Sequence, residues 1–158
     1  MVRTGAGPGG ANDREPDPVP EDYPHRRAFP TRWNDEDAFG HLNNTVYYSA
    51  MDTTITGWLL DGDDLGLLAG GFRPVVVQSS CTYRRSAHYP EVLEVGLRST
   101  RVGRSSMTYD LGLFRQRDGA LVARGTWVHV AVDAATGEPV PVPEPLRARL
   151  AGISAPPA

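Results

Sequence analysis

The sequence of 158 residues contains no lysine and only one cysteine, and its net charge is −3. The absence of lysine excludes Schiff-base and P-loop chemistry, because both need its amine. A single cysteine excludes an internal disulfide and a zinc site built from cysteines. A net negative charge argues against binding that depends on neutralising nucleic-acid phosphates, so we expect no nucleic-acid partner.

Long apolar runs are also missing. No run approaches the roughly 20 residues that a membrane-spanning helix needs, so we expect no membrane partner. The N-terminal stretch lacks the apolar segment that is typical of a secretory signal. Together with the single cysteine, these features lead us to expect a cytoplasmic protein.

Proline is scarce in the middle of the chain. Of the 14 prolines, only Pro74 and Pro90 lie in the central part, and the others gather at the two ends. The ends also combine glycine and polar residues without any periodicity. This composition predicts one domain over residues 25–151, between a disordered N-terminal tail over residues 1–24 and a flexible C-terminal tail over residues 152–158.

One segment has the period of a helix face. Four pairs of mainly apolar residues recur every three to four positions, namely Val46/Tyr47, Ala50/Met51, Thr54/Ile55 and Trp58/Leu59. Asn43 or Asn44 is suited to cap the first turn. Asp52 is the only charged residue in this segment, so we expect the helix to be buried and central.

Strand-like alternation dominates the rest of the domain. Four alternating runs follow the helix and begin near Val75, Leu93, Met107 and Val122. A weaker strand precedes the helix over His25–Trp33, and a short helix follows the last run. The sequence therefore predicts an α+β fold in which an antiparallel sheet covers one helix. The free face and edges of such a sheet favour a dimer.

The densest group of ionisable and amide side chains lies between the first strand and the helix. Its members are Asp35, Glu36, Asp37, His41, Asn43 and Asn44. The first turn of a helix presents unpaired N–H groups and a partial positive charge, which stabilise an oxygen that develops negative charge. A carboxylate held beside that turn can act as a nucleophile or a general base. The group is therefore suited to acyl transfer, and a loop that only caps the helix is the alternative.

Metal sites fit this loop poorly. Asp35 and Asp37 resemble the start of a calcium-binding loop, but Phe39 and Val46 stand where that loop requires oxygen ligands. A zinc site from the two aspartates and His41 is disfavoured. We expect neither a metal nor a cofactor.

Two other reactive side chains lie in predicted strands. Cys81 stands in a valine-rich run without a basic partner nearby, so we expect an inert thiol. His129 alternates within the last strand, and we expect it to serve packing or to lie on the surface.

The run from Arg32 to Tyr48, with Asp-Glu-Asp-Ala-Phe-Gly-His-Leu-Asn-Asn at its centre, resembles the signature of the hotdog-fold acyl-CoA thioesterases. The similarity is to the 4-hydroxybenzoyl-CoA thioesterase-like branch. It continues through Tyr83-Arg84-Arg85, Tyr89-Pro90-Glu91, Val102-Gly103-Arg104-Ser105-Ser106 and the stretch from Asp133 to Pro141. The resemblance implies a hotdog fold, in which a five-stranded antiparallel sheet wraps a long central helix. It also implies a homodimer or a dimer of dimers, with active sites at the subunit interface.

The resemblance implies roles for the loop residues. Asp37 corresponds to the catalytic carboxylate, and it acts as a nucleophile or a general base. The backbone N–H of Asn44, seven residues further on, polarises the thioester carbonyl. His41 and Asn43 orient the loop or contact the substrate.

The resemblance also implies substrate contacts, at Tyr47 and at Arg104, Ser105 and Ser106, which match a segment near the CoA arm. The expected substrate is an acyl-CoA or an acyl-carrier thioester, so CoA is part of the substrate and no cofactor is needed. The implied reaction is hydrolysis to a free acid and CoA. Two alternatives are a non-catalytic acyl-CoA-binding hotdog protein and a hotdog hydratase or dehydratase of 3-hydroxyacyl thioesters that pairs the aspartate with the loop histidine.

Overall fold

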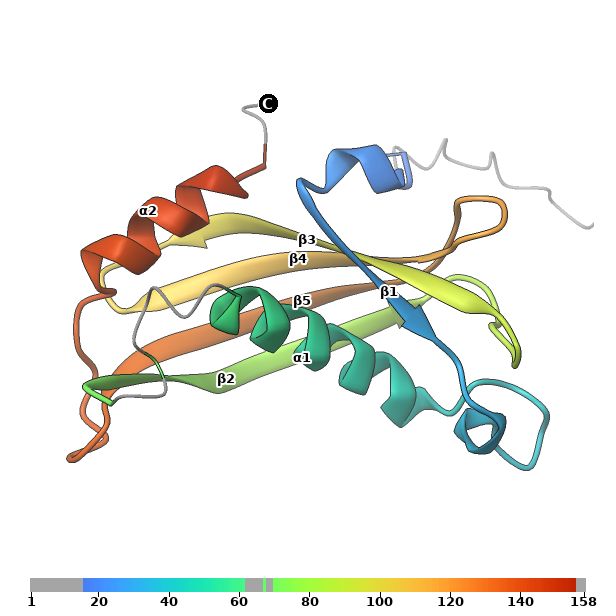
Figure 1. Ribbon diagram of the computed structural model, residues 1–158, viewed down its shortest axis with the longest axis horizontal. Coiled ribbons are helices and arrows are strands. Elements are labelled where there is room, and N and C mark those ends of the chain that lie inside the picture. The colour runs from blue at the N-terminus through green and yellow to red at the C-terminus, as the bar shows by residue number, and fades with distance from the viewer. Residues whose placement is uncertain (1–15, 62–66, 68–69, 156–158) are drawn as a thin grey trace, which may run out of the picture.

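Five antiparallel strands form one sheet, and a long helix lies along one of its faces (Figure 1). In the computed structural model, the described residues are 16–61, 67 and 70–155. The elements in chain order are η1 (Pro20–Asp22), β1 (His25–Pro30), η2 (Trp33–Asp35), α1 (Asn44–Leu60), β2 (Phe72–Tyr83), β3 (Val92–Val102), β4 (Ser106–Arg115), β5 (Ala120–Asp133) and α2 (Glu144–Gly152). The strand order is β1-β3-β4-β5-β2, and every pairing is antiparallel. The predicted α+β arrangement of one central helix and five strands is confirmed.

The buried face of α1 consists of the same eight residues that the helical period predicts. The opposite face is exposed and carries mostly hydroxyl side chains, including Ser49, Thr53 and Thr56. The expectation of a buried helix is therefore met on one face only. Sequence composition misleads here because hydroxyls, unlike charges, do not mark a solvent-facing side strongly.

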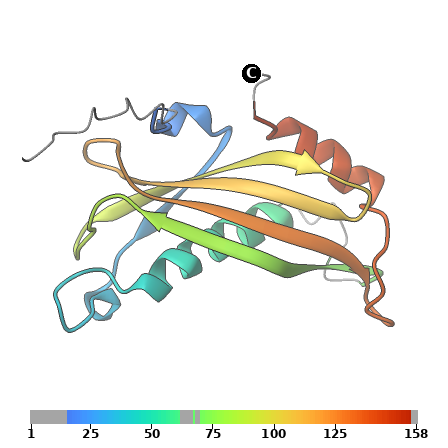
Figure 2. The ribbon, with the colours of Figure 1, turned by 180° about the vertical axis from the view of Figure 1, so that it is seen from behind.

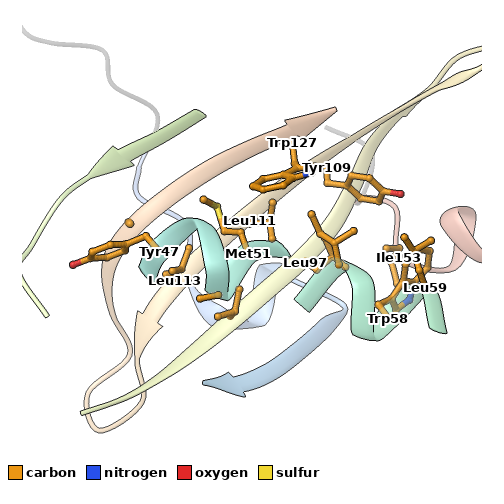
Figure 3. Packing of buried hydrophobic residues seen from close by; sticks show 14 of the residues in the cluster. Tyr47, Met51, Trp58, Leu59, Leu97, Tyr109, Leu111, Leu113, Trp127 and Ile153 are labelled. Carbon is orange, nitrogen blue, oxygen red and sulfur yellow. The ribbon is translucent and has the colours of Figure 1, made fainter. Parts of the chain in front are cut away.

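The helix approaches the sheet closely at Gly125 of β5. A Cβ atom at this position would collide with the side chain of Met51. Figure 3 shows Met51 on α1 near Leu111 and Leu113 of β4, and all three residues are fully buried. A glycine in this strand thus lets the helix pack against the middle of the sheet.

The N-terminal segment is more ordered than its composition suggests. The sequence places the domain boundary at residue 25, but Tyr23 is fully buried and its ring packs edge-on against Phe114, with centroids 5.6 Å apart. Tyr23, Phe114 and Leu121 form a second, small core. The packed domain therefore begins before residue 25, because one aromatic ring fixes the short helix η1 to the sheet. Residues 1–15 lie outside the described part of the chain.

The C-terminal segment departs from its expectation in the same way. Ile153, in the predicted flexible tail, is buried. Its carbonyl oxygen accepts a hydrogen bond from the N–H of Ser99 at 2.8 Å, and the N–H of Ala155 donates to the Ser99 carbonyl at 3.0 Å. Backbone pairing with β3 thus extends the ordered domain past residue 151. No helix among the described residues is long and apolar enough to cross a membrane.

Candidate functional site

The two aspartates of the loop before α1 have different environments. Asp35 is buried, and its carboxylate accepts hydrogen bonds from the backbone N–H of Arg32 at 2.7 Å and from the Arg32 guanidinium at 2.7 Å. These bonds lower the pKa of Asp35. Its carbonyl oxygen accepts the N–H of Asn43 at 2.8 Å. Asp35 therefore holds the loop together and does not face a substrate.

Asp37 is held by the turn that it begins. Its Oδ1 atom accepts hydrogen bonds from the N–H groups of Phe39 at 2.8 Å and His41 at 3.2 Å. Its Oδ2 atom has no hydrogen-bond partner among the described residues. The side chain is thus fixed through one oxygen, and the other is available for chemistry.

The segment after β2 anchors this loop. The N–H of Leu42 donates to the carbonyl of Ala87 at 2.9 Å, and the N–H of Tyr89 donates to Oε1 of Glu36 at 2.9 Å. The ring Nδ1 of His88 lies 2.8 Å from the carbonyl oxygen of Gly40. These contacts hold the loop at residues before and after Asp37, so Asp37 has a defined position relative to α1.

The first turn of α1 leaves one N–H group unpaired. Oδ1 of Asn43 accepts the N–H of Thr45 at 3.0 Å, and the Asn43 carbonyl accepts the N–H of Val46 at 2.9 Å. The N–H of Asn44 has no acceptor among the residues that the structure describes. Because the helix dipole adds partial positive charge here, this N–H is suited to an oxyanion.

A cleft of about 310 Å³ opens beside this N–H. Its lining residues are Asp37, His41, Leu42, Asn44, Tyr47, Tyr83, Arg84, Arg85 and Ser86. Four of the predicted site residues, Asp37, His41, Asn44 and Tyr47, therefore meet in one cleft. The cleft is lined both by the residue that carries the half-free carboxylate and by the residue that carries the unpaired helix N–H, the two kinds of group that an acyl-transfer site needs.

Other predicted site residues lie elsewhere. Asn43 uses its side chain to cap α1 and does not line the cleft. The turn between β3 and β4 contains Arg104 and Ser105 and leads into Ser106, the first residue of β4. Both ribbon views show this turn next to α2, at the opposite end of the sheet from the start of α1 (Figures 1 and 2). The carbonyl of Arg104 accepts the N–H of Val142 at 2.8 Å. Within one chain, this turn fastens the C-terminal segment and does not reach Asp37.

His41 lines the cleft and contacts Asp37 through its backbone N–H. Its ring lies beside the ring of His88, with centroids 5.5 Å apart. Among the described residues, no side-chain hydrogen bond joins His41 to Asp37.

The end of β2 and the residues after it line part of the cleft, and the sequence predicts no role for them. Tyr83 packs edge-on against Tyr47 with ring centroids 5.0 Å apart. Burial, and then the neighbouring Cys81, raise the pKa of Tyr83 to about 12, so its phenol stays neutral. Arg85 donates to the carbonyl of Leu121 at 2.9 Å. In the sequence, these residues are marked only by their position at the end of the alternating run that forms β2. Alternation does not predict that this strand ends beside the start of α1.

The two other reactive side chains behave as expected. Burial raises the pKa of the Cys81 thiol, which favours an inert thiol. His129 is buried, its Nε2 atom accepts a hydrogen bond from the indole N–H of Trp127 at 3.1 Å, and burial lowers its pKa to about 4. In the described part of the chain, no three histidine, cysteine, aspartate or glutamate side chains gather as metal ligands would.

Similarity to known proteins identifies the family of this chain. A family model described as the thioesterase-like superfamily matches residues 31–150. The chain is similar to the PA5185 protein of Pseudomonas aeruginosa, with 37% identity and a TM-score of 0.84 over 90% of this chain and 100% of that chain. It is also similar to a thioesterase from Thermus thermophilus, whose crystal structure is a complex with coenzyme A and Zn, with 29% identity and a TM-score of 0.71 over 87% of this chain and 99% of that chain.

A more distant likeness extends to the fold alone. A 1,4-dihydroxy-2-naphthoyl-CoA thioesterase from Synechocystis shares 19% identity and a TM-score of 0.72, over 80% of this chain and 94% of that chain. No curated protein matches the chain.

Proposed function

Because the chain belongs to the thioesterase-like superfamily and is a thioester hydrolase, we propose that it hydrolyses an acyl-CoA to the free acid and CoA. The observation that carries this proposal is one cleft that both Asp37 and Asn44 line. Among the described residues, neither Oδ2 of Asp37 nor the N–H of Asn44 has a hydrogen-bond partner. The similarity to a thioesterase that was crystallised with coenzyme A supports CoA as the carrier.

The proposed reaction uses the two groups on opposite sides of the thioester carbonyl. The carbonyl oxygen accepts the N–H of Asn44, and the dipole of α1 stabilises the negative charge that develops there. Oδ2 of Asp37 either attacks the carbonyl carbon to form a mixed anhydride or removes a proton from an attacking water. In the first route, the C–S bond breaks as the anhydride forms, CoA leaves as a thiolate, and water then hydrolyses the anhydride to the free acid and restores the Asp37 carboxylate. In the second route, the water adds to the carbonyl carbon, the C–S bond breaks, and the proton that Asp37 removed passes to the CoA thiolate.

The remaining cleft residues support these two groups. Tyr47 and Tyr83 offer aromatic surface to the acyl-bearing end of the substrate. His41 holds Asp37 through its backbone N–H, and Asn43 holds the first turn of α1 through its side chain. We therefore assign His41 and Asn43 positioning roles.

A homodimer would bring more of the predicted residues to the site. β2 is an edge strand that pairs only with β5 in the sheet, and Val75, Val76 and Val77 on it are exposed. Such an apolar edge is suited to pair with a second copy. Antiparallel pairing of two β2 edges reverses the sheet end for end, so the second copy's turn with Arg104, Ser105 and Ser106 would come to the end that holds Asp37. We propose that this turn contacts the CoA arm across the dimer.

Substitution of Asp37 tests the proposal. We expect Asp37→Asn to lower kcat by a factor on the order of 10²–10⁴, because the amide is neither a nucleophile nor a base, while acyl-CoA binding persists. The measurement is release of free CoA, detected with a thiol reagent, across short, long and aromatic acyl-CoAs. Glu138→Gln, at an exposed carboxylate far from the cleft, is the matched control. Unchanged hydrolysis in Asp37→Asn, with acyl-CoA still bound, would favour the non-catalytic binding alternative for this cleft.

Isotope labelling distinguishes the two roles of Asp37. In a single turnover in ¹⁸O-water, label recovered in the Asp37 carboxylate supports the anhydride route. Mass spectrometry of the peptide that carries Asp37 reads this result directly.

A further inference from the structure

A second hollow, of about 380 Å³, lies on the other face of the sheet from α1. Its lining residues are Ser80, Thr82, Arg84, Thr100, Tyr109, Asp110, Arg124 and Thr126. Arg84 lines both this hollow and the cleft that contains Asp37. The two spaces therefore share one lining residue, at the end of β2.

The chemistry of this outer hollow favours a phosphate. The hydroxyls of Ser80, Thr82 and Thr126 have no hydrogen-bond partner among the described residues, so they can donate to a ligand. Arginine binds phosphate oxygens through two parallel hydrogen bonds. The residues that line the hollow include two arginines, Arg84 and Arg124, and one acidic residue, Asp110. Asp110 is itself buried and accepts from Arg98 at 2.7 Å and from Arg124 at 2.8 Å, so its charge is already compensated.

The length of the carrier arm also points to this hollow. In a phosphopantetheine thioester, the pantetheine chain separates the thioester from the first phosphate. When the thioester lies between Asp37 and Asn44, the phosphate must therefore lie beyond the mouth of the cleft. We propose that the phosphate of the carrier arm binds Arg84 and the neighbouring hydroxyls of the outer hollow. This inference rests on the proposed thioesterase function, and it names a phosphate that CoA and acyl carrier proteins share.

The N-terminal segment supplies a competitor for that phosphate. Oδ1 of Asp17 lies 3.5 Å from Nε of Arg84, and both side chains are more than a third exposed. An exposed ion pair of this kind contributes little stability. A phosphate that binds Arg84 would displace the Asp17 carboxylate, so the two partners should affect substrate binding in opposite directions.

Paired substitutions test this arrangement. We expect Arg84→Gln to raise KM for an acyl-CoA about tenfold at similar kcat, since a charge-assisted hydrogen bond contributes on the order of 1.5–3 kcal/mol. KM for the matching acyl-pantetheine, which has no phosphate, should not change. Asp17→Asn should lower KM for the acyl-CoA about twofold. Arg101→Gln, at an exposed arginine on β3 that lines neither space, is the control.

The outcomes separate this inference from the proposed function. The phosphate assignment would be overturned if Arg84→Gln changed KM equally for the acyl-CoA and the acyl-pantetheine. It would also be overturned if Arg84→Gln and Asp17→Asn shifted KM for the acyl-CoA in the same direction. If the wild-type protein hydrolyses neither substrate, the proposed function fails, and calorimetry with CoA alone decides whether Arg84→Gln weakens binding. Acyl-phosphopantetheine distinguishes the two sources: an effect of full size there assigns the phosphate next to pantetheine, and an effect confined to acyl-CoA assigns the nucleotide phosphates.

Discussion

At the scale of single residues, two adjacent asparagines contribute to the start of α1 in different ways. Asn43 contributes its side chain, which accepts the N–H and the hydroxyl of Thr45 at 3.0 Å and 2.9 Å. Asn44 contributes its backbone N–H to the cleft, and its own side chain is exposed. The same residue type therefore has a structural role at one position and a proposed catalytic role at the next.

Alanine substitutions should separate these roles. Loss of the Asn43 cap should lower the free energy of unfolding by about 1 kcal/mol, which thermal or chemical denaturation measures. Asn44→Ala should keep kcat within about twofold, because alanine retains the N–H that serves as the oxyanion donor. A loss of kcat in Asn44→Ala as large as that in Asp37→Asn would contradict the assignment to the backbone.

His129 should make stability depend on pH. Burial lowers its pKa from 6.5 to about 4, so the unfolded chain takes up a proton near pH 6.5 while the folded chain resists it. The stability that depends on neutral His129 is complete above pH 6.5 and is lost as the pH falls towards 4. We expect the free energy of unfolding to fall by on the order of 2 kcal/mol over this window.

Chemical denaturation at several pH values between 4 and 7 measures this slope. His129→Gln removes the titrating group and should flatten it. Some slope should persist, because burial also lowers the pKa of His25. The hydrogen-bonded carboxylate of Asp35 titrates below its ordinary value of 3.8 and so acts outside this window. Equal slopes in the wild type and His129→Gln would contradict the prediction.

At the scale of elements, the N-terminal segment depends on glycine in β3. A Cβ atom at Gly96 would lie 2.5 Å from Cγ of Tyr23, in the ring body rather than at a flexible tip. Tyr23 also donates a hydrogen bond from its hydroxyl to Asp110 at 3.2 Å, and Arg98 lies over its ring at 4.8 Å. The position of Tyr23 thus couples η1 to the outer hollow.

Gly96→Ala should therefore displace Tyr23 and loosen the N-terminal segment. We expect a loss of stability of about 1–3 kcal/mol and faster proteolysis near residue 23, with the rest of the sheet intact. Gly152→Ala is the control, since no atom lies within 4 Å of a Cβ at that position. Limited proteolysis with mass spectrometry locates the cut, and protection equal to that of the wild type would argue against this packing.

At the scale of the whole molecule, the proposal assigns the edge strand β2 to a dimer interface and makes a complete site depend on that dimer. We predict a dimer in solution that Val77→Lys converts to a monomer, because a lysine on an edge strand opposes strand pairing. The monomer should retain its fold and lose most of its activity on acyl-CoA. Light scattering coupled to gel filtration measures the mass. Val19→Lys, at an exposed valine in the N-terminal segment, should remain dimeric, and a fully active Val77→Lys monomer would contradict the shared site.

The helix, four of the strands and the location of the candidate site could be predicted from local patterns in the sequence. The helical period identified all eight buried residues of α1, because side chains three or four residues apart share one helix face. Alternation located four strands for the same kind of reason, since its period is two. The loop before α1 could be linked to acyl transfer because its carboxylates directly precede the first turn of a helix. The resemblance to the hotdog thioesterases then singled out Asp37 and Asn44.

The tertiary structure decided which other residues lie beside Asp37 and Asn44. Arg32 binds the carboxylate of Asp35, whereas Asp37 lines the cleft. The end of β2 adds Tyr83 and Arg84 to the cleft lining, and the turn that contains Arg104 lies at the far end of the sheet. It also decided that Tyr23 belongs to the packed domain. These relations join residues far apart in the chain, and they depend on strand register and on the packing of helix against sheet. A periodic pattern determines which way a side chain faces within its own element, but not what it meets on another.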